Sequence, residues 1–453
     1  MRAIWLMAVL LLPPSATMLA EDSGPGSVTA ARTTTTSPEP THEVLLLDDL
    51  VRETLEKSPE VQSALHAVGA LERRVPQAKT LPDPMASVGW MGNITPFSVQ
   101  QGDPSSYRSL AVSEQFPYPG KLKLRGEMAS KDAEAAHADY EAVRRKVTAD
   151  VKAAYYDYFY FDKAIQTTTR NKELLEKLSK ISEARYRVGK AMQQDVLRSQ
   201  VEISLLLQKL TVLEQQRATA QARINTFLLR APESPLPPTA DVEPASLRYS
   251  LDELYALAAA NDTAALRNQK LVEKNRLGVA LAQKEYRPDF GVGYMYQQRP
   301  AMMDMHGITV SVNLPIFYKS KQRQGVAEAS EDLLSAEKGR DSRLNEIRFE
   351  LKQQYLQAKA SEQLLSLYTK AIVPQSSLAL ESSMASYQVG NIDFLSLLAN
   401  FTTLWSYETD YYRQLADYHT SLARIEVLTG SEVTDSAKPA LPVSDHESAK
   451  GDN

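Results

Sequence analysis

Cysteine is missing from all 453 residues of the sequence. Its absence excludes disulfide bonds, thiolate metal sites, thiol nucleophiles and a lipid-modified N-terminal cysteine. The sequence also lacks an H-E-x-x-H helix and a nucleophile-elbow motif. Its six histidines are scattered along the chain, at His42, His66, His137, His306, His419 and His446. We therefore predict that the protein is not an enzyme and has no cofactor.

An excess of positive charge is lacking as well. The net charge is −5, so nothing indicates a nucleic-acid partner. With 24% charged and 43% hydrophobic residues, the chain as a whole is not of the disordered class. Beyond the N-terminal segment no run of 18 apolar residues occurs, which predicts no transmembrane helix. The exported chain is therefore either soluble or part of a β-barrel, the other structure that can span a membrane.

The two ends of the sequence differ in composition from the rest. Residues 1–20 are typical of a secretory signal peptide, with a basic Arg2, a short apolar segment at 4–12 and small residues near Ala20. An uncleaved anchor is the alternative. Residues 21–43 are rich in Ser, Thr and Pro and predict a flexible leader, and the polar residues 431–453 predict a disordered tail.

The two halves of the chain carry four matching landmarks in the same order. The pairs are LDDL at 47–50 with LDEL at 251–254, LPDPMASVGW from 81 with RPDFGVGY from 287, EQFPYPGK from 114 with VNLPIFYK from 312, and YRVG from 186 with YQVG from 387. The spacing within each pair stays between 198 and 206 residues. This pattern indicates an internal duplication with repeats at 44–230 and 251–430. The proline-bearing residues 231–250 are the predicted linker.

Each repeat is predicted to run helix, strand, strand, long helix, helix. Residues 121–188 contain no proline and a single glycine, Gly126. They predict one helix about 100 Å long that ends at the Y-x-V-G turn. Ser58-Pro59 and Asn261-Asp262 are predicted helix starts, because Ser and Asp cap helices and Pro suits the first turn. Pro374 predicts a kink in the corresponding long helix of the second repeat.

The predicted strands alternate between apolar and polar residues. The alternation is clear at 290–297 and 308–314 and weaker at 88–90 and 110–116, where Glu114 falls on the apolar side. Such segments suit a membrane barrel, but a half-buried soluble sheet shows the same period. Four strands cannot close a barrel. Two copies would give eight strands with a filled interior, and three copies would give twelve strands that can leave a pore.

These landmarks, in this order, resemble the TolC-type outer-membrane efflux family over about residues 45–430. The run that begins YQVGNIDFLSLL is most similar to the heavy-metal (Cus- and Czc-type) branch. The resemblance implies a homotrimer with a twelve-strand barrel in outer-membrane lipid on a twelve-helix periplasmic tube. It also implies an exit duct that takes substrates, metal cations or else drugs, from a periplasmic adaptor and an inner-membrane pump of the resistance–nodulation–division (RND) type. The alternative function is a soluble periplasmic helical adaptor or structural protein.

The resemblance assigns two kinds of site residue. The Y-x-V-G segments become helix turns that dock the adaptor, with Val188, Gly189, Lys190 and Ala191 in one and Val389, Gly390, Asn391 and Ile392 in the other. Asp195 and Tyr387 match a carboxylate–tyrosine pair that helps to close the entrance. An exposed helix carboxylate and a packing tyrosine are the simpler interpretation. Ser396 and Ala399 stand where the archetype carries acidic residues, which places an acidic ring in doubt.

Two further clusters have simple structural interpretations. Met302, Met303, Met305 and His306 lie between two predicted strands and bear ligands that suit Cu(I) or Ag(I), but a plain loop is the default. Six aromatic residues between 155 and 162 cover several faces of one helix and predict helix–helix packing rather than a ligand site.

Overall fold

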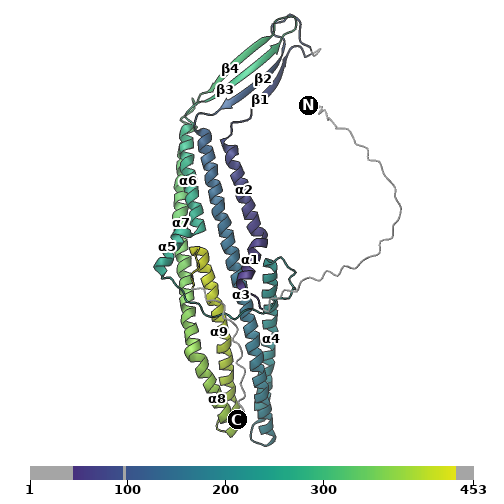
Figure 1. Ribbon diagram of the computed structural model, residues 1–453, viewed down its shortest axis with the longest axis vertical. Helices are drawn as coiled ribbons and strands as arrows, with labels where there is room; N and C mark the ends of the chain where they lie inside the picture. The colour runs from purple at the N-terminus through teal and green to yellow at the C-terminus, as the bar shows by residue number, and fades with distance from the viewer. Residues whose placement is uncertain (1–43, 95–97, 435–453) are drawn as a thin grey trace, which may run out of the picture. The chain divides into compact units, whose positions relative to one another are not determined.

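The computed structural model describes residues 44–94 and 98–434 (Figure 1). The predicted signal peptide, the predicted leader and the predicted tail from residue 435 onward lie outside these ranges. The predicted first repeat contains α1 (Leu47–Lys57), α2 (Pro59–Lys79), β1 (Met85–Met91), β2 (Tyr107–Phe116), α3 (Lys121–Arg187) and α4 (Gln193–Phe227). The second contains α5 (Leu251–Asn261), α6 (Thr263–Lys284), β3 (Asp289–Gln298), β4 (Met305–Asn313), α7 (Gln322–Leu367), η1 (Tyr368–Ile372), α8 (Val373–Val389) and α9 (Phe394–Thr429). Within the described ranges no helix has an apolar stretch long enough to cross a membrane.

The helices begin where the capping residues predict. The Ser58 hydroxyl accepts a hydrogen bond from the Val61 N–H (3.4 Å), and α2 follows with Pro59 in its first turn. In the second repeat the Asp262 carboxylate accepts from the Ala265 N–H (2.8 Å) and α6 begins at the next residue. α3 is a single helix of 67 residues, about 100 Å long at 1.5 Å per residue.

The second repeat breaks the corresponding helix. Pro374 lies in the first turn of α8, directly after the π-helical turn η1. Proline has no N–H to donate, and its ring clashes with the carbonyl four residues earlier, so the α-helical ladder cannot run through it. The wider π turn accommodates this loss. The irregularity that Pro374 predicts therefore takes the form of a π-helical turn.

The four strands form one antiparallel sheet in the order β1-β2-β3-β4 (Figure 1). The central pair joins the two repeats, because β2 of the first repeat pairs with β3 of the second, from Phe116 opposite Phe290 to Arg108 opposite Gln298. In the described part of this chain, β1 and β4 have neighbours on one side only.

The register separates apolar from polar side chains. Even-numbered residues pair with even-numbered residues throughout the sheet, and so do odd-numbered ones. Because directly opposite residues face the same side, each parity occupies one face. The even face carries mostly large apolar side chains, among them Val88, Leu110, Val112, Phe290, Val292, Tyr294, Ile308, Val310 and Val312, all exposed in this chain. The odd face is mostly Gly, Ser, Thr and Gln. The predicted alternation is therefore confirmed, including Glu114 on the apolar face.

The helices pack into three hydrophobic clusters. One joins α5, α7 and α9, a second joins α1, α3 and α4 with the linker, and a third lies where α3 and α4 meet α8 and α9. Four residues of the predicted aromatic run, Tyr155, Tyr156, Tyr158 and Phe159, are buried in the first two clusters. The prediction that this run serves helix packing is confirmed.

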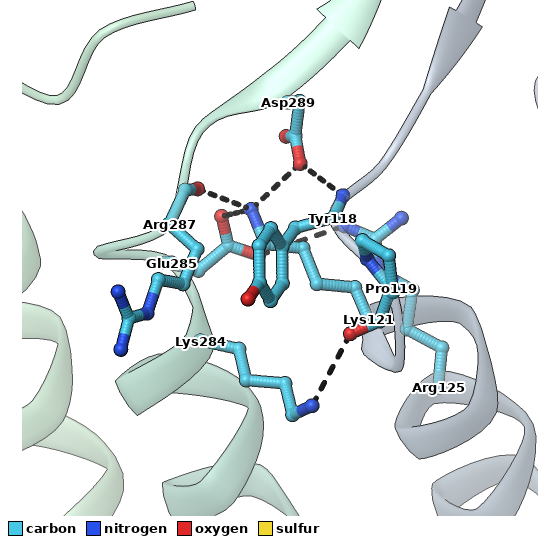
Figure 2. Close-up of polar contacts among 8 residues, drawn as sticks. All are labelled: Tyr118, Pro119, Lys121, Arg125, Lys284, Glu285, Arg287 and Asp289. Carbon is cyan, nitrogen blue, oxygen red and sulfur yellow. Dashed lines mark hydrogen bonds and ion pairs between the residues drawn. The ribbon is translucent and has the colours of Figure 1, made fainter.

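A buried lysine links the repeats where the sheet gives way to helices (Figure 2). Only 1% of Lys121 is exposed, and its Nζ donates to Glu285 Oε2 (2.9 Å), Asp289 Oδ1 (2.9 Å) and the Arg287 carbonyl (3.3 Å). The same Asp289 oxygen accepts from the Tyr118 N–H (2.7 Å). Burial opposes the charged form, but the hydrogen bonds to Glu285 and Asp289 raise the pKa of Lys121 above its usual value.

We predict that Lys121→Met destabilises the protein by about 2 to 3 kcal/mol, because two carboxylates would lose their buried counter-charge. Chemical unfolding followed by circular dichroism measures the loss. Lys123→Met is the matched control, since Lys123 lies two residues further along α3, is exposed and makes only a 3.7 Å ion pair with Glu127. Equal stability of the two variants would contradict the prediction.

Candidate functional site

The first Y-x-V-G segment forms the turn between α3 and α4. α3 ends at Arg187, and the turn closes through hydrogen bonds from the Gly189 N–H to the Tyr186 carbonyl (2.9 Å) and from the Lys190 N–H to the Arg185 carbonyl (2.8 Å). Gly189 has a φ of +69°, a conformation that glycine adopts without steric cost. No other residue lies within 4 Å of the position a Cβ would take there, so this turn borders open space.

The second segment forms the turn between α8 and α9 in the same way. The Gly390 N–H donates to the Tyr387 carbonyl (3.1 Å), the Asn391 N–H donates to the Ser386 carbonyl (2.9 Å), and Gly390 has a φ of +87°. Asp393 then caps α9 by accepting from the Ser396 N–H (3.1 Å). Hydrogen bonds from Ser396 lower the pKa of Asp393, so this carboxylate is charged at neutral pH.

Each turn presents an aliphatic side chain to its surroundings. Val188 is 67% exposed and Val389 is 72% exposed, although both belong to well-formed turns. The other predicted docking residues border the same turns. Lys190 and Asn391 are exposed, whereas Ala191 and Ile392 are partly buried. Exposed valines beside a tight glycine turn give each helix end a small apolar knob. Such a knob can fit a groove of a partner protein.

The predicted gate residues have other contacts in this chain. The Asp195 carboxylate accepts from the backbone N–H of Met192 (3.3 Å) and so caps α4. Tyr387 is 3% exposed, and its ring meets Phe394 edge-on with the ring centroids 5.7 Å apart. Its hydroxyl is buried without a hydrogen-bond partner among residues 44–94 and 98–434. A hydrogen bond between Asp195 and Tyr387 is thus not formed within the chain, and their pairing between neighbouring helix pairs stays a prediction.

The polar residue that does contact Tyr387 is one that sequence reasoning missed. Arg185, in the last turn of α3, places its guanidinium carbon 4.6 Å from the centre of the Tyr387 ring and donates to the Tyr387 carbonyl. A signal was available, because Arg185 directly precedes the Y-x-V-G motif while the equivalent position of the second repeat is Ser386. Such a difference at a shared motif indicates that the residue makes a contact in one repeat that the other repeat lacks.

The methionine-rich segment does not hold its side chains on one side. Met302 and Met303 precede β4, whereas Met305 and His306 are its first two residues. Successive strand residues point to opposite faces, so these last two side chains diverge. His306 Nδ1 is also engaged by the Tyr294 hydroxyl (2.6 Å). Among the described residues no group of three or more His, Asp or Glu side chains could hold a metal ion.

Part of the sequence matches a known family, and the fold resembles solved structures. Residues 50–228 match the family described as outer membrane efflux protein. The predicted resemblance to the outer membrane efflux protein family is confirmed. The matched residues cover nearly the whole first repeat, from α1 to the end of α4. No curated protein sequence matches the chain.

Three solved structures illustrate the likeness in fold. The outer membrane protein VceC from Vibrio cholerae is 16% identical, with 85% of this chain and 96% of that chain covered and a TM-score of 0.73. CusC, described in connection with transmembrane channel formation, is 13% identical, with 84% and 91% covered and a TM-score of 0.73. The open state of the MtrE outer membrane channel from Neisseria gonorrhoeae is 16% identical, with 92% and 99% covered and a TM-score of 0.66. The chain, including both predicted repeats, therefore shares the fold of these outer membrane proteins.

Proposed function

We propose that the protein is the outer-membrane exit duct of a tripartite efflux system, with a long periplasmic extension. The observation that carries this proposal is a fold shared with outer membrane channels over most of the chain, together with the family match of residues 50–228. The duct has no energy source of its own. It receives substrate from a periplasmic adaptor and an inner-membrane RND pump and does no covalent chemistry.

The sheet supports placement of the strands in outer-membrane lipid. Its even face is mostly apolar across four strands, and its large apolar side chains are exposed in this chain, which is costly for a protein surrounded by water. The odd face carries mostly small or polar side chains, which suit the border of an aqueous lumen. A soluble adaptor or structural protein, the alternative function, would have no use for this surface, so we favour the duct.

The open sheet edges support a homotrimer. In the described chain β1 and β4 each have a neighbouring strand on one side only, and such sheet edges must be paired inside a lipid bilayer. Pairing β4 of one chain with β1 of the next closes the sheet without edges. Three chains give a barrel of twelve strands around a lumen. Two chains would give a barrel of eight strands, and side chains would fill its interior.

We expect the detergent-extracted protein to have the mass of three chains, because a lone sheet would leave both edges in contact with lipid or detergent. Native mass spectrometry or light scattering with detergent subtraction measures the mass. A stable monomer or dimer would refute the duct proposal as a whole.

The two glycine turns are the proposed docking surface for the adaptor, with Val188, Gly189, Lys190 and Ala191 in one and Val389, Gly390, Asn391 and Ile392 in the other. They support the proposal because both expose apolar side chains while the backbone around each glycine is tightly hydrogen-bonded. A trimer would present six such turns, three of each kind. The adaptor would then contact both repeats of every chain.

We predict that Gly189→Val abolishes export while the protein still reaches the outer membrane. The new side chain enters open space, but a β-branched residue at a φ of +69° strains the turn by about 1 to 2 kcal/mol and alters its shape. Drug or metal susceptibility and cell fractionation measure the two effects, and Gly390→Val should act alike. Gly339→Val is the control, since Gly339 lies within helix α7 with no other residue within 4 Å of its Cβ position. Full export by both turn variants would show that the turns do not dock.

The proposed gate is a hydrogen bond between Asp195 and Tyr387 across neighbouring helix pairs. The Tyr387 hydroxyl is buried without a partner in the described chain, so pairing requires the contact around it to open, and the bond to Asp195 would then satisfy this hydroxyl. Asp195 is positioned by its cap at the start of α4 and would have to give up or share that bond. The pair would act without the acidic ring of the archetype, since Ser396 and Ala399 replace it.

We expect Asp195→Ala and Tyr387→Phe each to raise single-channel conductance in planar bilayers, because either change removes the charge-assisted hydrogen bond. The double variant should add less than the sum of the single effects, since both break one link. Unchanged conductance in both single variants would refute the pairing. Strictly additive increases would mean that the two residues act separately.

Metal cations are the proposed substrate class, on the resemblance of the second-half turn to the heavy-metal branch, with drugs as the alternative. The likeness in fold does not favour either class, because a shared fold does not fix the transported substrate. In a tripartite system the pump selects the substrate. The segment with Met302, Met303, Met305 and His306 therefore has no assigned part in selection.

A further inference from the structure

Arg185 contacts both helix turns of the chain at once. Its Nη1 donates to the Tyr387 carbonyl and to the Gln388 carbonyl (3.1 Å), both at the C-terminal end of α8. Its Nη2 lies 3.4 Å from the Lys190 carbonyl in the turn that follows α3. The same guanidinium covers the face of the Tyr387 ring. One side chain of the first repeat therefore connects the first turn to the end of the helix that precedes the second turn.

The position suits a cation for two physical reasons. The last carbonyls of a helix have no intrahelical partner and carry the negative end of the helix dipole, so a guanidinium there is stabilising. The planar fork of arginine can also donate to several carbonyls while stacking on an aromatic ring, which the single ammonium of lysine cannot do. A cation over an exposed ring contributes less than one over a desolvated ring, and Tyr387 is buried.

The equivalent tyrosines of the two repeats differ in exposure, and Arg185 contributes to the difference together with the hydrophobic cluster around Tyr387. Tyr186 and Tyr387 begin the two Y-x-V-G motifs, yet Tyr186 is 44% exposed while Tyr387 is 3% exposed. Arg185 covers Tyr387, whereas the residue before Tyr387 is Ser386, which cannot reach across in return. The arginine of this contact therefore comes from the first repeat and the tyrosine from the second, and the reverse contact has no equivalent arginine.

Two polar groups at the contact between Arg185 and Tyr387 lack hydrogen-bond partners. Arg185 Nε and the Tyr387 hydroxyl are both buried without a hydrogen-bond partner in the part of the chain that the structure describes. Water would satisfy both groups if the contact opened, so opening recovers part of the free energy that the lost hydrogen bonds cost. A contact of this kind holds two segments in register while remaining releasable.

We propose that Arg185 is a positioning residue that ties the two turns of each chain into one docking unit. It holds the end of α8 against the end of α3, so that the valines of both turns keep a defined spacing for the partner protein. This inference rests on the proposed docking role for its functional meaning, but the tie itself can be measured without any partner.

Hydrogen exchange of the full-length protein in detergent tests the tie. In Arg185→Met the Gly390 and Asn391 amides should exchange about tenfold faster, because the carbonyls around them lose a charged donor. Arg185→Lys should give a smaller increase, since lysine keeps the charge but not the fork. Arg187→Met is the matched control, because Arg187 is an exposed neighbour on the same turn that pairs with Glu183 (2.7 Å). Exchange within α3 from residue 121 to 175 should stay unchanged in all three variants.

The outcomes separate the tie from the docking role. Equal exchange of the second turn in Arg185→Met and Arg187→Met would overturn the inference, whatever their export activity. If Arg185→Met fails to fold, Arg185→Lys decides in its place, and exchange at the wild-type rate overturns the inference. Faster exchange together with reduced export supports both the tie and docking. Faster exchange with full export supports the tie and refutes docking through these turns.

Discussion

One buried cation sets the junction on which both repeats depend. Lys121 is the first residue of α3, and its two carboxylate partners, Glu285 and Asp289, come from the second repeat. A charge with 1% exposure is tolerable only when opposite charges lie within hydrogen-bond distance. The start of α3 and the start of β3 must therefore coincide in space. The register of β2 against β3 follows, because Phe116 and Phe290 are the next opposed residues along the strands.

The junction at Lys121 anchors one end of the long helix α3. α3 runs without interruption from Lys121 to Arg187, so its far turn lies about 100 Å along the helix from the anchored end. Because the helix is buried against α2, α4, α6 and α9 along its course, it has few ways to bend. The position of the turn at residues 188–191 is set by the same element that fixes the sheet. In the proposed duct, this rigid helix would fix the distance between the sheet and the turn.

The duplicated repeats are not equivalent in detail. α3 is continuous, whereas the second repeat interrupts the corresponding helix with a π turn before Pro374. The two turns have the same backbone hydrogen bonds, yet one tyrosine is exposed and the other is buried beneath Arg185. The two Y-x-V-G turns thus share a backbone conformation, and the difference between Arg185 and Ser386 gives them different contacts. A trimer built from these chains would alternate two kinds of helix end.

The sequence by itself determined the features that depend on local chemistry. Capping by Ser58 and Asp262, the break at Pro374, the glycine turns and the two-residue period of the strands all follow from conformational preferences of single residues and their neighbours. The order of these landmarks sufficed to predict the resemblance to the outer membrane efflux protein family. Contacts between residues far apart in the chain were decided only by the tertiary structure. The pairing of β2 with β3, the burial of Lys121 and the tie from Arg185 to Tyr387 join residues about 165 to 200 positions apart. Lysine and arginine are mostly solvated in folded proteins. Nothing in their local sequence therefore predicts that Lys121 is buried, that Arg185 is partly buried, or that both bind the other repeat.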